Sequence, residues 1–367
     1  MDESVNLAAW VVWGGFGLAL VLGFVAARTN FCTMGAISDV VNMEHWGRVR
    51  MWLLAIAVAM IGTNLLYYVD LIDLSKSIYQ RPSLPWLSML VGGALFGVGM
   101  TLAGGCANKN LLRLGGGSLR SLVVLVFVAI SAYMTLKGLF GQWRSSFLDP
   151  VAIDLSGLGM QGQSLSHLLA ALTGLPAKTA LLAATVIVVL ALLIFVFKDK
   201  RFRATGEQVI GGVILGLIIT AGWYLTGHIG FAENPETLEL TFFGTSSRTL
   251  ESMSFVAPVA YTLELLMLWT DKSLRLTFGV ATVLGVTLGS LIYALGARKF
   301  RWEGFASVED LGNQIVGGLL MGFGGVTAMG CTIGQGMTGI STLAIGSFIA
   351  LSGIVAGSVA TMKWQQR

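Results

Sequence analysis

The chain has 367 residues, of which 55% are hydrophobic and only 11% are charged, and its mean hydropathy is +0.78. This balance excludes an ordinary soluble globular protein. The net charge of +4 does not indicate nucleic-acid binding, because the basic residues lie in short segments beside apolar stretches, as in a membrane topology signal.

The small number of cysteines and histidines excludes two other classes of protein. Three cysteines without a Cys-x-x-Cys pair, and three histidines, form neither a disulfide framework nor a metal-ligand cluster of recognisable spacing. We therefore expect free thiols, no metal and no cofactor. The sequence also lacks a nucleotide-binding motif, which argues against ATP-driven transport by this chain alone.

Nine apolar segments are long enough to cross a hydrocarbon core of about 30 Å. The residues before the first of them, MDESVNL, lack the basic region of a signal peptide, so we expect the first segment to be retained as a span. These segments predict an all-α polytopic membrane bundle in which residues 1–367 form a single membrane domain. The expected spans are residues 7–27, 49–69, 87–105, 119–139, 177–197, 207–226, 275–297, 311–330 and 340–362.

The basic loops predict the orientation of the spans. Segments 198–203 (KDKRFR) and 298–301 (RKFR) are strongly basic and are expected in the cytoplasm by the positive-inside rule. Alternation of the nine spans then places the N-terminus outside and the C-terminus in the cytoplasm. A tenth span at 253–270 would place segment 298–301 outside and Glu264 within the membrane, so we expect 253–270 to be re-entrant or interfacial.

Two of the apolar segments repeat one motif. Residues 91–106 (VGGALFGVGMTLAGGC) and 316–331 (VGGLLMGFGGVTAMGC) are identical at nine of sixteen positions without a gap. In the predicted topology the two copies cross the membrane in opposite directions. We therefore expect an inverted repeat of residues 1–140 and 207–367, with residues 141–206 as a linker that carries the extra span.

The repeated segments end within the membrane. Residues 89–103 make a helix of about 22 Å, shorter than the core of about 30 Å. Gly104 and Gly105 supply the flexible backbone that ends the helix, and we expect the residues after them to be irregular chain lining a cavity. The second copy predicts the same arrangement at 329–336.

All three cysteines lie in such glycine-containing breaks. Cys106 and Cys331 end the two copies, and Cys32 follows the first span in RTNFCTMG. Residues 226–230 are at the comparable place in the second half and hold no cysteine. Each thiol either faces a pathway at a helix end or fills a gap as a small hydrophobe.

The other candidate residues each have two interpretations. Arg28, Lys109 and Arg113 either set the topology or attract an anion. Asn108, Asn110 and Gln335 either line a vestibule, together with the backbone of Gly105 and Gly330, or satisfy loop backbone. His228 and Glu264 either couple protons or make ordinary packing contacts.

These segments resemble the YeeE/YedE sulphur-transport family of bacterial inner-membrane proteins. The resemblance rests on RTNFCTMG around Cys32, on AGGC with RLGGG after Cys106, and on MGFGGVTAMGCTIGQG around Cys331. It implies an inverted repeat with loops that dip to the middle, and a relay of thiosulfate along the three thiols by S–H···S hydrogen bonds. Met329 and Gln335 depart from the family pattern, which often has glycine and asparagine there.

The resulting expectation is a membrane permease, not an enzyme, that imports thiosulfate or a related inorganic sulphur anion. A soluble sulphur-carrier or sulphurtransferase protein is a further expected partner. Two alternatives stay open: a membrane thiol oxidoreductase or sulphurtransferase, against which the lack of a Cys-x-x-Cys pair argues, and a transporter of a selenium compound.

Overall fold

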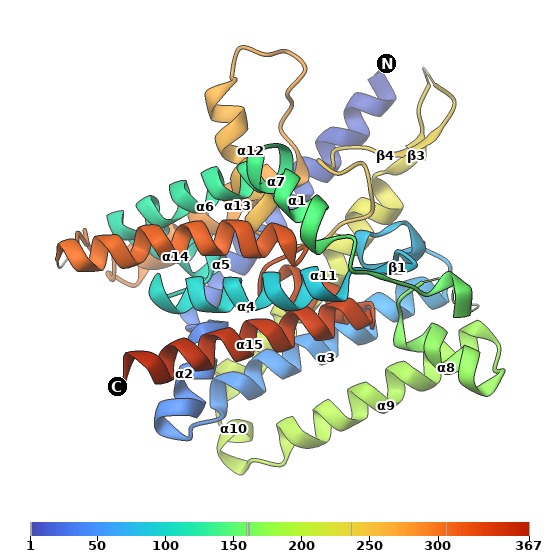
Figure 1. Ribbon diagram of the computed structural model, residues 1–367, viewed down its shortest axis with the longest axis horizontal. Coiled ribbons are helices and arrows are strands. Elements are labelled where there is room, and N and C mark those ends of the chain that lie inside the picture. Colours follow the sequence, from blue (N-terminus) through green and yellow to red (C-terminus); the bar gives the residue numbers. More distant parts are fainter. Residues whose placement is uncertain (1, 159, 161, 236, 306, 367) are drawn as a thin grey trace.

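The computed structural model describes residues 2–366 apart from 159, 161, 236 and 306, and most of the described chain is helical (Figure 1). The long helices are α1 (Asp2–Arg28), α3 (Gly47–Tyr68), α4 (Trp86–Leu102), α6 (Leu119–Lys137), α9 (Ala177–Phe197), α11 (Gly206–Tyr224), α13 (Phe278–Gly296), α14 (Val308–Thr327) and α15 (Ile345–Gln365).

Shorter elements connect them. The short α-helices are α2 (Thr33–Met43), α5 (Ala107–Gly115), α7 (Leu139–Trp143), α8 (Leu165–Thr173), α10 (Lys200–Ala204) and α12 (Val256–Met267). Short 3-10 or π turns are η1 (Leu74–Lys76), η2 (Ile78–Gln80), η3 (Arg144–Leu148), η4 (Ser156–Leu158), η5 (Leu225–Ile229) and η6 (Gly334–Gly339). The strands β1 (Ser83–Leu84) and β2 (Ile153–Asp154) form one antiparallel pair, and β3 (Phe231–Glu233) and β4 (Leu240–Phe242) form another.

The helices confirm a polytopic membrane bundle. Each of the nine expected spans falls on one of the nine long helices in the described part of the chain. By length and composition, eight helical segments of the described chain are apolar enough to cross a membrane. Helix α14 is outside that set because its first two turns hold Glu309, Asp310, Asn313 and Gln314.

Segment 253–270 contains only the 12-residue helix α12, which at about 1.5 Å per residue is too short to span a bilayer core. Its N-terminal end is buried, with Phe255 0% and Val256 1% exposed, and its C-terminal end is exposed at Met267. Helix α12 therefore enters the bundle from the surface without crossing it.

The segments after the helix breaks differ from the expectation of irregular chain. Residues 107–115 form helix α5, and residues 334–339 form the π-helical segment η6. The expectation was wrong because the backbone groups freed at each break are satisfied within a new helix, which needs no partner from outside.

The connecting segments gather at two ends of the bundle. One end, here called the basic face, holds residues 28–50, 104–120, 198–208, 297–305 and 307–310, joined by hydrogen bonds such as Arg301 N–Gly116 O (3.1 Å) and Leu119 N–Glu303 O (2.9 Å). The other end, here called the loop face, holds residues 69–85, 138–158, 162–164, 230–235 and 237–255. Figure 1 shows α2 and the C-terminus at one end of the bundle and β1 and α8 at the other.

The two copies of the repeated motif pack against each other in opposite directions. Gly92, near the start of α4, faces Ala328, just beyond the end of α14, whereas Gly99 faces Gly317. The most extensive helix contacts also come in matched pairs: α1 packs on α13 as α11 packs on α3, and α4 packs on α15 as α14 packs on α6. The antiparallel contact of the two copies agrees with the predicted inversion.

Glycines set the closeness of these contacts. A Cβ atom on Gly97 of α4 would run into the carbonyl oxygen of Ile354 on α15, and one on Gly357 of α15 would run into the carbonyl of Ala94. Between helices in a lipid environment, close backbone approach through small residues supplies the packing attraction that the hydrophobic effect supplies in water. The glycine-rich composition is thereby explained as helix packing.

Replacing Gly97 with alanine is expected to lower the free energy of unfolding by about 1–3 kcal/mol, because the added methyl group overpacks the interface of α4 with α15. Gly17→Ala is the matched control, since a Cβ atom there meets nothing within 4 Å. Thermal unfolding of both variants in the same detergent measures the difference, and equal midpoints would contradict this account of the interface.

Candidate functional site

Three long helices end in the same way just before a cysteine. The residue two positions before each cysteine has left-handed backbone geometry: Asn30 (φ 52°), Gly104 (φ 66°) and Met329 (φ 57°). The residue immediately before each cysteine donates its backbone N–H to a carbonyl five residues back, at 3.0 Å for Phe31, 2.8 Å for Gly105 and 2.7 Å for Gly330. This hydrogen-bond pattern is a Schellman ending, which satisfies carbonyl groups that a terminating helix would leave unpaired.

Each cysteine then begins the next helical segment. The Cys32 sulphur accepts a hydrogen bond from the Gly35 N–H at 3.3 Å, and the Cys331 sulphur accepts one from the Gly334 N–H at 3.4 Å. Cys106 likewise precedes helix α5, but its side chain makes no capping hydrogen bond. A thiol in this position lies among the free N–H groups of a helix N-terminus, where the helix dipole favours negative charge.

The structure brings the three thiols together. Cys32, Cys106 and Cys331 are all buried and free. Cys106 lies close enough to both of the others to interact with them electrostatically, and the hydroxyl of Thr332 lies beside its thiol. Three segments that are distant in the sequence therefore meet at one place in the bundle, here called the thiol cluster.

Unpaired polar atoms accompany the thiol cluster. Asn108 Oδ1 and Thr332 Oγ1 are buried and have no nitrogen or oxygen partner in the described part of the chain. The Gly334 N–H bonds to the Cys331 sulphur at 3.4 Å. Because an unpaired buried polar group costs about 1–3 kcal/mol, this concentration of donors and acceptors suits a polar ligand that passes between the thiols.

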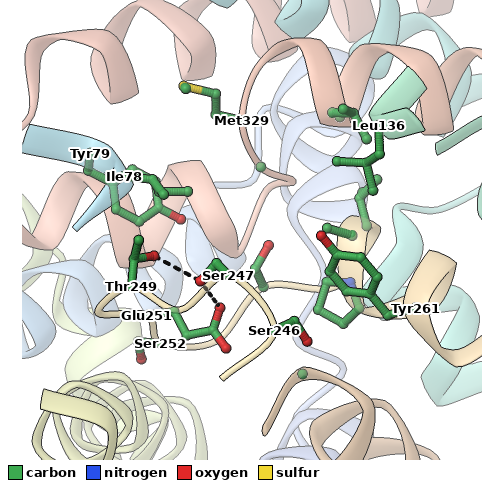
Figure 2. Close-up of a pocket in the computed structure, with 18 of the residues that line it drawn as sticks. Ile78, Tyr79, Leu136, Ser246, Ser247, Thr249, Glu251, Ser252, Tyr261 and Met329 are labelled. Atoms are coloured by element: carbon green, nitrogen blue, oxygen red, sulfur yellow. Dashed lines mark hydrogen bonds between the residues drawn. The ribbon is translucent and has the colours of Figure 1, made fainter. Parts of the chain in front are cut away.

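A cavity of about 230 Å³ leads from the loop face toward Cys331 (Figure 2). Met329 and Gly330, the two residues before Cys331, form part of its wall. Figure 2 shows Met329 at one end of the cavity and Glu251, Ser247 and Tyr261 around the other. This space is here called the loop-face cavity.

Two further hollows lie on the approaches to the thiol cluster. A polar basin of about 800 Å³ shares Ser246 and Tyr261 with the loop-face cavity, and Lys137, Arg248 and Arg275 line it. A cavity of about 200 Å³ on the basic face is lined by residues that include Gly104, Asn110, Arg113 and Arg120. The loop-face cavity thus reaches Gly330, next to Cys331, and the cavity on the basic face reaches Gly104, two residues before Cys106.

The predicted residues around Cys106 lie close to it. Lys109 is half-buried against Gly105 and acts electrostatically on both Cys32 and Cys106. Asn108 is buried, and Arg113 is exposed in the wall of the basic-face cavity. Their roles in lining a pathway stay predictions.

Other predicted residues have specific structural partners. The Gln335 side chain is fully buried: its Nε2 donates to Ala328 O at 2.5 Å, and its Oε1 accepts from Ser347 Oγ at 2.5 Å. Asn110 donates to Gly105 O at 2.9 Å and to Cys106 O at 3.1 Å. These bonds hold the two cysteine turns in shape, whereas a lining role for Gln335 is still a prediction.

The remaining candidates lie away from the thiol cluster. Arg28 forms a 2.8 Å ion pair with Glu207 on the basic face. His228 stacks on Tyr224, and its Nδ1 is 3.2 Å from the Leu71 carbonyl oxygen. Glu264 accepts hydrogen bonds from Tyr133 at 2.7 Å and from Lys137 at 2.9 Å.

Sequence reasoning missed Tyr79, Glu251 and Thr332. Tyr79 and Glu251 lie in connecting segments without a motif, and their meeting depends on contacts such as the Leu250 N–Lys76 O bond between distant loops. Thr332 follows Cys331 directly, so its position beside a cysteine was the only available signal.

A family model described as sulphur transport matches residues 28–360. The chain belongs to the sulphur transport family. The resemblance to the YeeE/YedE family, based on the three cysteine segments, is thereby confirmed. The eight apolar helical segments agree with a multi-pass membrane protein of this family.

Two relatives of this chain are named as thiosulfate transporters. The thiosulfate transporter TsuA of Escherichia coli (strain K12) is 27% identical to this sulphur transport family member over 371 residues, which cover 96% of this chain and 94% of the relative. The thiosulfate transporter TsuA of Spirochaeta thermophila is 27% identical over 364 residues, which cover 96% of this chain and 98% of the relative.

Gly104→Val is expected to destabilise this family member by about 1–3 kcal/mol, because a β-branched residue is strained at positive φ. Gly104→Asn is the matched control and is expected to stay near the wild type, since Asn30 adopts this geometry in the equivalent turn. The thermal unfolding midpoints of the two variants check the prediction. A valine variant as stable as the asparagine variant would show that the left-handed turn is not needed.

Proposed function

We propose that this protein is a permease that imports thiosulfate, or a closely related inorganic sulphur anion, along the thiol cluster. The observation that carries the proposal is the meeting of three free, buried thiols, with one cavity that reaches the turn before Cys331 and another that reaches the turn before Cys106. The names of the relatives TsuA support thiosulfate as the passenger.

The direction of import follows from the proposed orientation. The basic face is assigned to the cytoplasm by the positive-inside rule, which places the N-terminus outside and the C-terminus inside. An anion then enters through the basin and the loop-face cavity, passes Cys331, Cys106 and Cys32, and leaves beside Lys109 and Arg113. A basic exit also fits a soluble, acidic sulphur-carrier protein that receives the ion.

The frame of the pathway is proposed to be an inverted repeat of residues 1–140 and 207–367, with residues 141–206 as the linker. The antiparallel contact of α4 with α14 and the matched helix pairs support it. In this frame α2, which packs on α15, corresponds to α12, which packs on α6. Phe255 precedes α12 as Cys32 precedes α2. The counterpart of the break at Cys32 is therefore proposed to lie at Phe255, and not at residues 226–230.

The chemistry of the thiols fits a brief hand-over of the ion. A neutral thiol is a weak hydrogen-bond donor, and a soft terminal sulphur can accept from it without a covalent bond. The Gly334 N–H beside Cys331 and the Thr332 hydroxyl provide donors for the oxygen end of the ion, whereas Asn108 Oδ1 can only accept and so can bind water that accompanies the ion. A pathway of several weak sites lets an ion bind well enough to enter and weakly enough to leave.

Cys106→Ala and Cys331→Ala are each expected to lower the initial rate of labelled thiosulfate uptake into proteoliposomes at least about tenfold, because one hand-over site is lost. Thr185→Ala is the matched control: Thr185 is another small buried residue, and it lines a groove between α3 and α9 away from the thiols. All variants are first checked for a wild-type unfolding midpoint. Undiminished uptake in both cysteine variants would overturn the relay.

A covalent mechanism makes a different prediction. If the protein were a thiol oxidoreductase or sulphurtransferase, a cysteine thiolate would attack the outer sulphur of thiosulfate, form a cysteine persulfide and release sulfite. The non-covalent relay predicts that intact-mass spectrometry of the purified protein shows the unmodified mass after exposure. An adduct at Cys32, Cys106 or Cys331 that forms as fast as uptake would favour the enzyme instead.

A further inference from the structure

Glu251 is an acidic residue in the wall of a cavity through which an anion is proposed to pass. Its main-chain carbonyl accepts a hydrogen bond from Thr226 Oγ1 at 2.5 Å, which fixes the segment. Its Oε2 accepts from Ser247 Oγ at 3.0 Å, and the backbone N–H of Ser246 also bonds to the carboxyl. Its Oε1 is buried and has no hydrogen-bond partner in the described part of the chain.

No ion pair with a cation in the described chain balances this carboxyl group. Arg144, which lines the same cavity, pairs with Asp149 at 3.1 Å. Arg81 and the phenols of Tyr79 and Tyr261 also line the cavity, and the two phenols are the titratable groups that interact with Glu251. Figure 2 shows Tyr79 and Tyr261 on different sides of the cavity.

The other charged groups of the neighbouring elements have contacts of their own. Lys76 of η1 lies over the Phe231 ring at 4.0 Å, and His228 of η5 stacks on Tyr224. Arg248 lies in the wall of the adjoining basin.

Burial therefore decides the charge of Glu251. It raises the pKa of the carboxyl to about 7, against the opposing effect of the hydrogen bonds from Ser247 and Ser246. Below a pH of about 7 the carboxyl group of Glu251 is mainly neutral, and above this pH the carboxylate dominates. An ionised carboxylate about 4 Å from a single negative charge repels it by about 4 kcal/mol at an effective dielectric constant of about 20.

We propose that Glu251 is a proton-binding site of the loop-face cavity and that, once protonated, it binds the incoming anion by donating an O–H bond from its unpaired oxygen. The inference rests on the proposed function of the protein as an anion permease. The neutral carboxyl replaces repulsion by a hydrogen bond, so protons on the outer side favour uptake. The same residue then rejects anions when it is ionised.

Tyr79 connects this site with the thiol cluster. Its buried phenol interacts electrostatically with both Glu251 and Cys331, and burial raises its pKa, so the ring stays neutral and does not add a negative charge to the pathway. Its hydroxyl also lies near Gly334, at 3.6 Å from where a Cβ atom on that residue would be. An anion that leaves Glu251 therefore meets a neutral hydroxyl before the first thiol.

The test measures KM and the maximal rate of thiosulfate uptake into proteoliposomes at external pH values between about 5.5 and 8.5, with the internal pH fixed. Thiosulfate remains a dianion over this range, so any dependence on pH belongs to the protein. In the wild type, KM is expected to rise at least about tenfold across a midpoint near pH 7 as repulsion sets in.

Two substitutions of Glu251 separate charge from hydrogen bonding. Glu251→Gln keeps a neutral donor, so its KM is expected to stay near the low-pH value of the wild type at every pH. Glu251→Leu is neutral without a donor, so its KM is expected to be higher and equally flat. Glu233→Gln is the matched control: Glu233 is an exposed acidic residue of the loop face that lines neither the loop-face cavity nor the basin, and this variant should keep the wild-type profile.

The possible outcomes are distinct. A wild-type pH profile in Glu251→Gln, or a folded Glu251→Gln that does not transport, would overturn the role of Glu251. A flat profile in the wild type would overturn it as well. No uptake by the wild type at any pH would instead refute the proposed permease function.

Discussion

The structure depends on one constraint: a backbone that stops being helical inside a bilayer must still satisfy its hydrogen bonds within the protein. Helices α1, α4 and α14 each end shortly before a cysteine, where a left-handed residue closes the carbonyl end of the helix. At Cys32 and Cys331 the sulphur then accepts a backbone N–H at the start of the next segment. These two sulphur atoms are thus among the groups that satisfy the backbone at the breaks.

The glycine contacts place these breaks next to one another. Because α4 and α14 approach at backbone distance, the end of each helix lies beside the start of the other, with Gly92 facing Ala328 and Gly99 facing Gly317. Larger side chains would separate the helices and move Cys106 away from Cys331. The same glycines that allow the helices to pack closely therefore also keep Cys106 and Cys331 close together, which explains why glycine recurs in both helices.

The sequence predicted the parts of this arrangement that depend on local pattern. Hydropathy located all nine long helices, and the repeated motif located the breaks at Cys106 and Cys331. The helix after Cys106 was missed because its polar residues suggest a loop, whereas the cap and the buried surroundings favour a helix. Gln335 was expected either to line a vestibule or to satisfy loop backbone; its hydrogen bond to the Ala328 carbonyl is of the second kind, and a lining role stays a prediction. The position of Glu251 in a cavity wall could not be predicted either, because it depends on the pairing of loops that are distant in the sequence.

Three thiols cannot be shared equally between two related halves. In the proposed frame, Cys106 and Cys331 are counterparts, whereas Cys32 has only the apolar ring of Phe255 opposite it. A passing ion therefore meets one sulphur on the side of the loop face and two on the side of the basic face. In that proposal the odd thiol makes a nearly symmetrical scaffold asymmetric, so that an ion arriving from the loop face meets the weak sites in a different order from an ion arriving from the basic face.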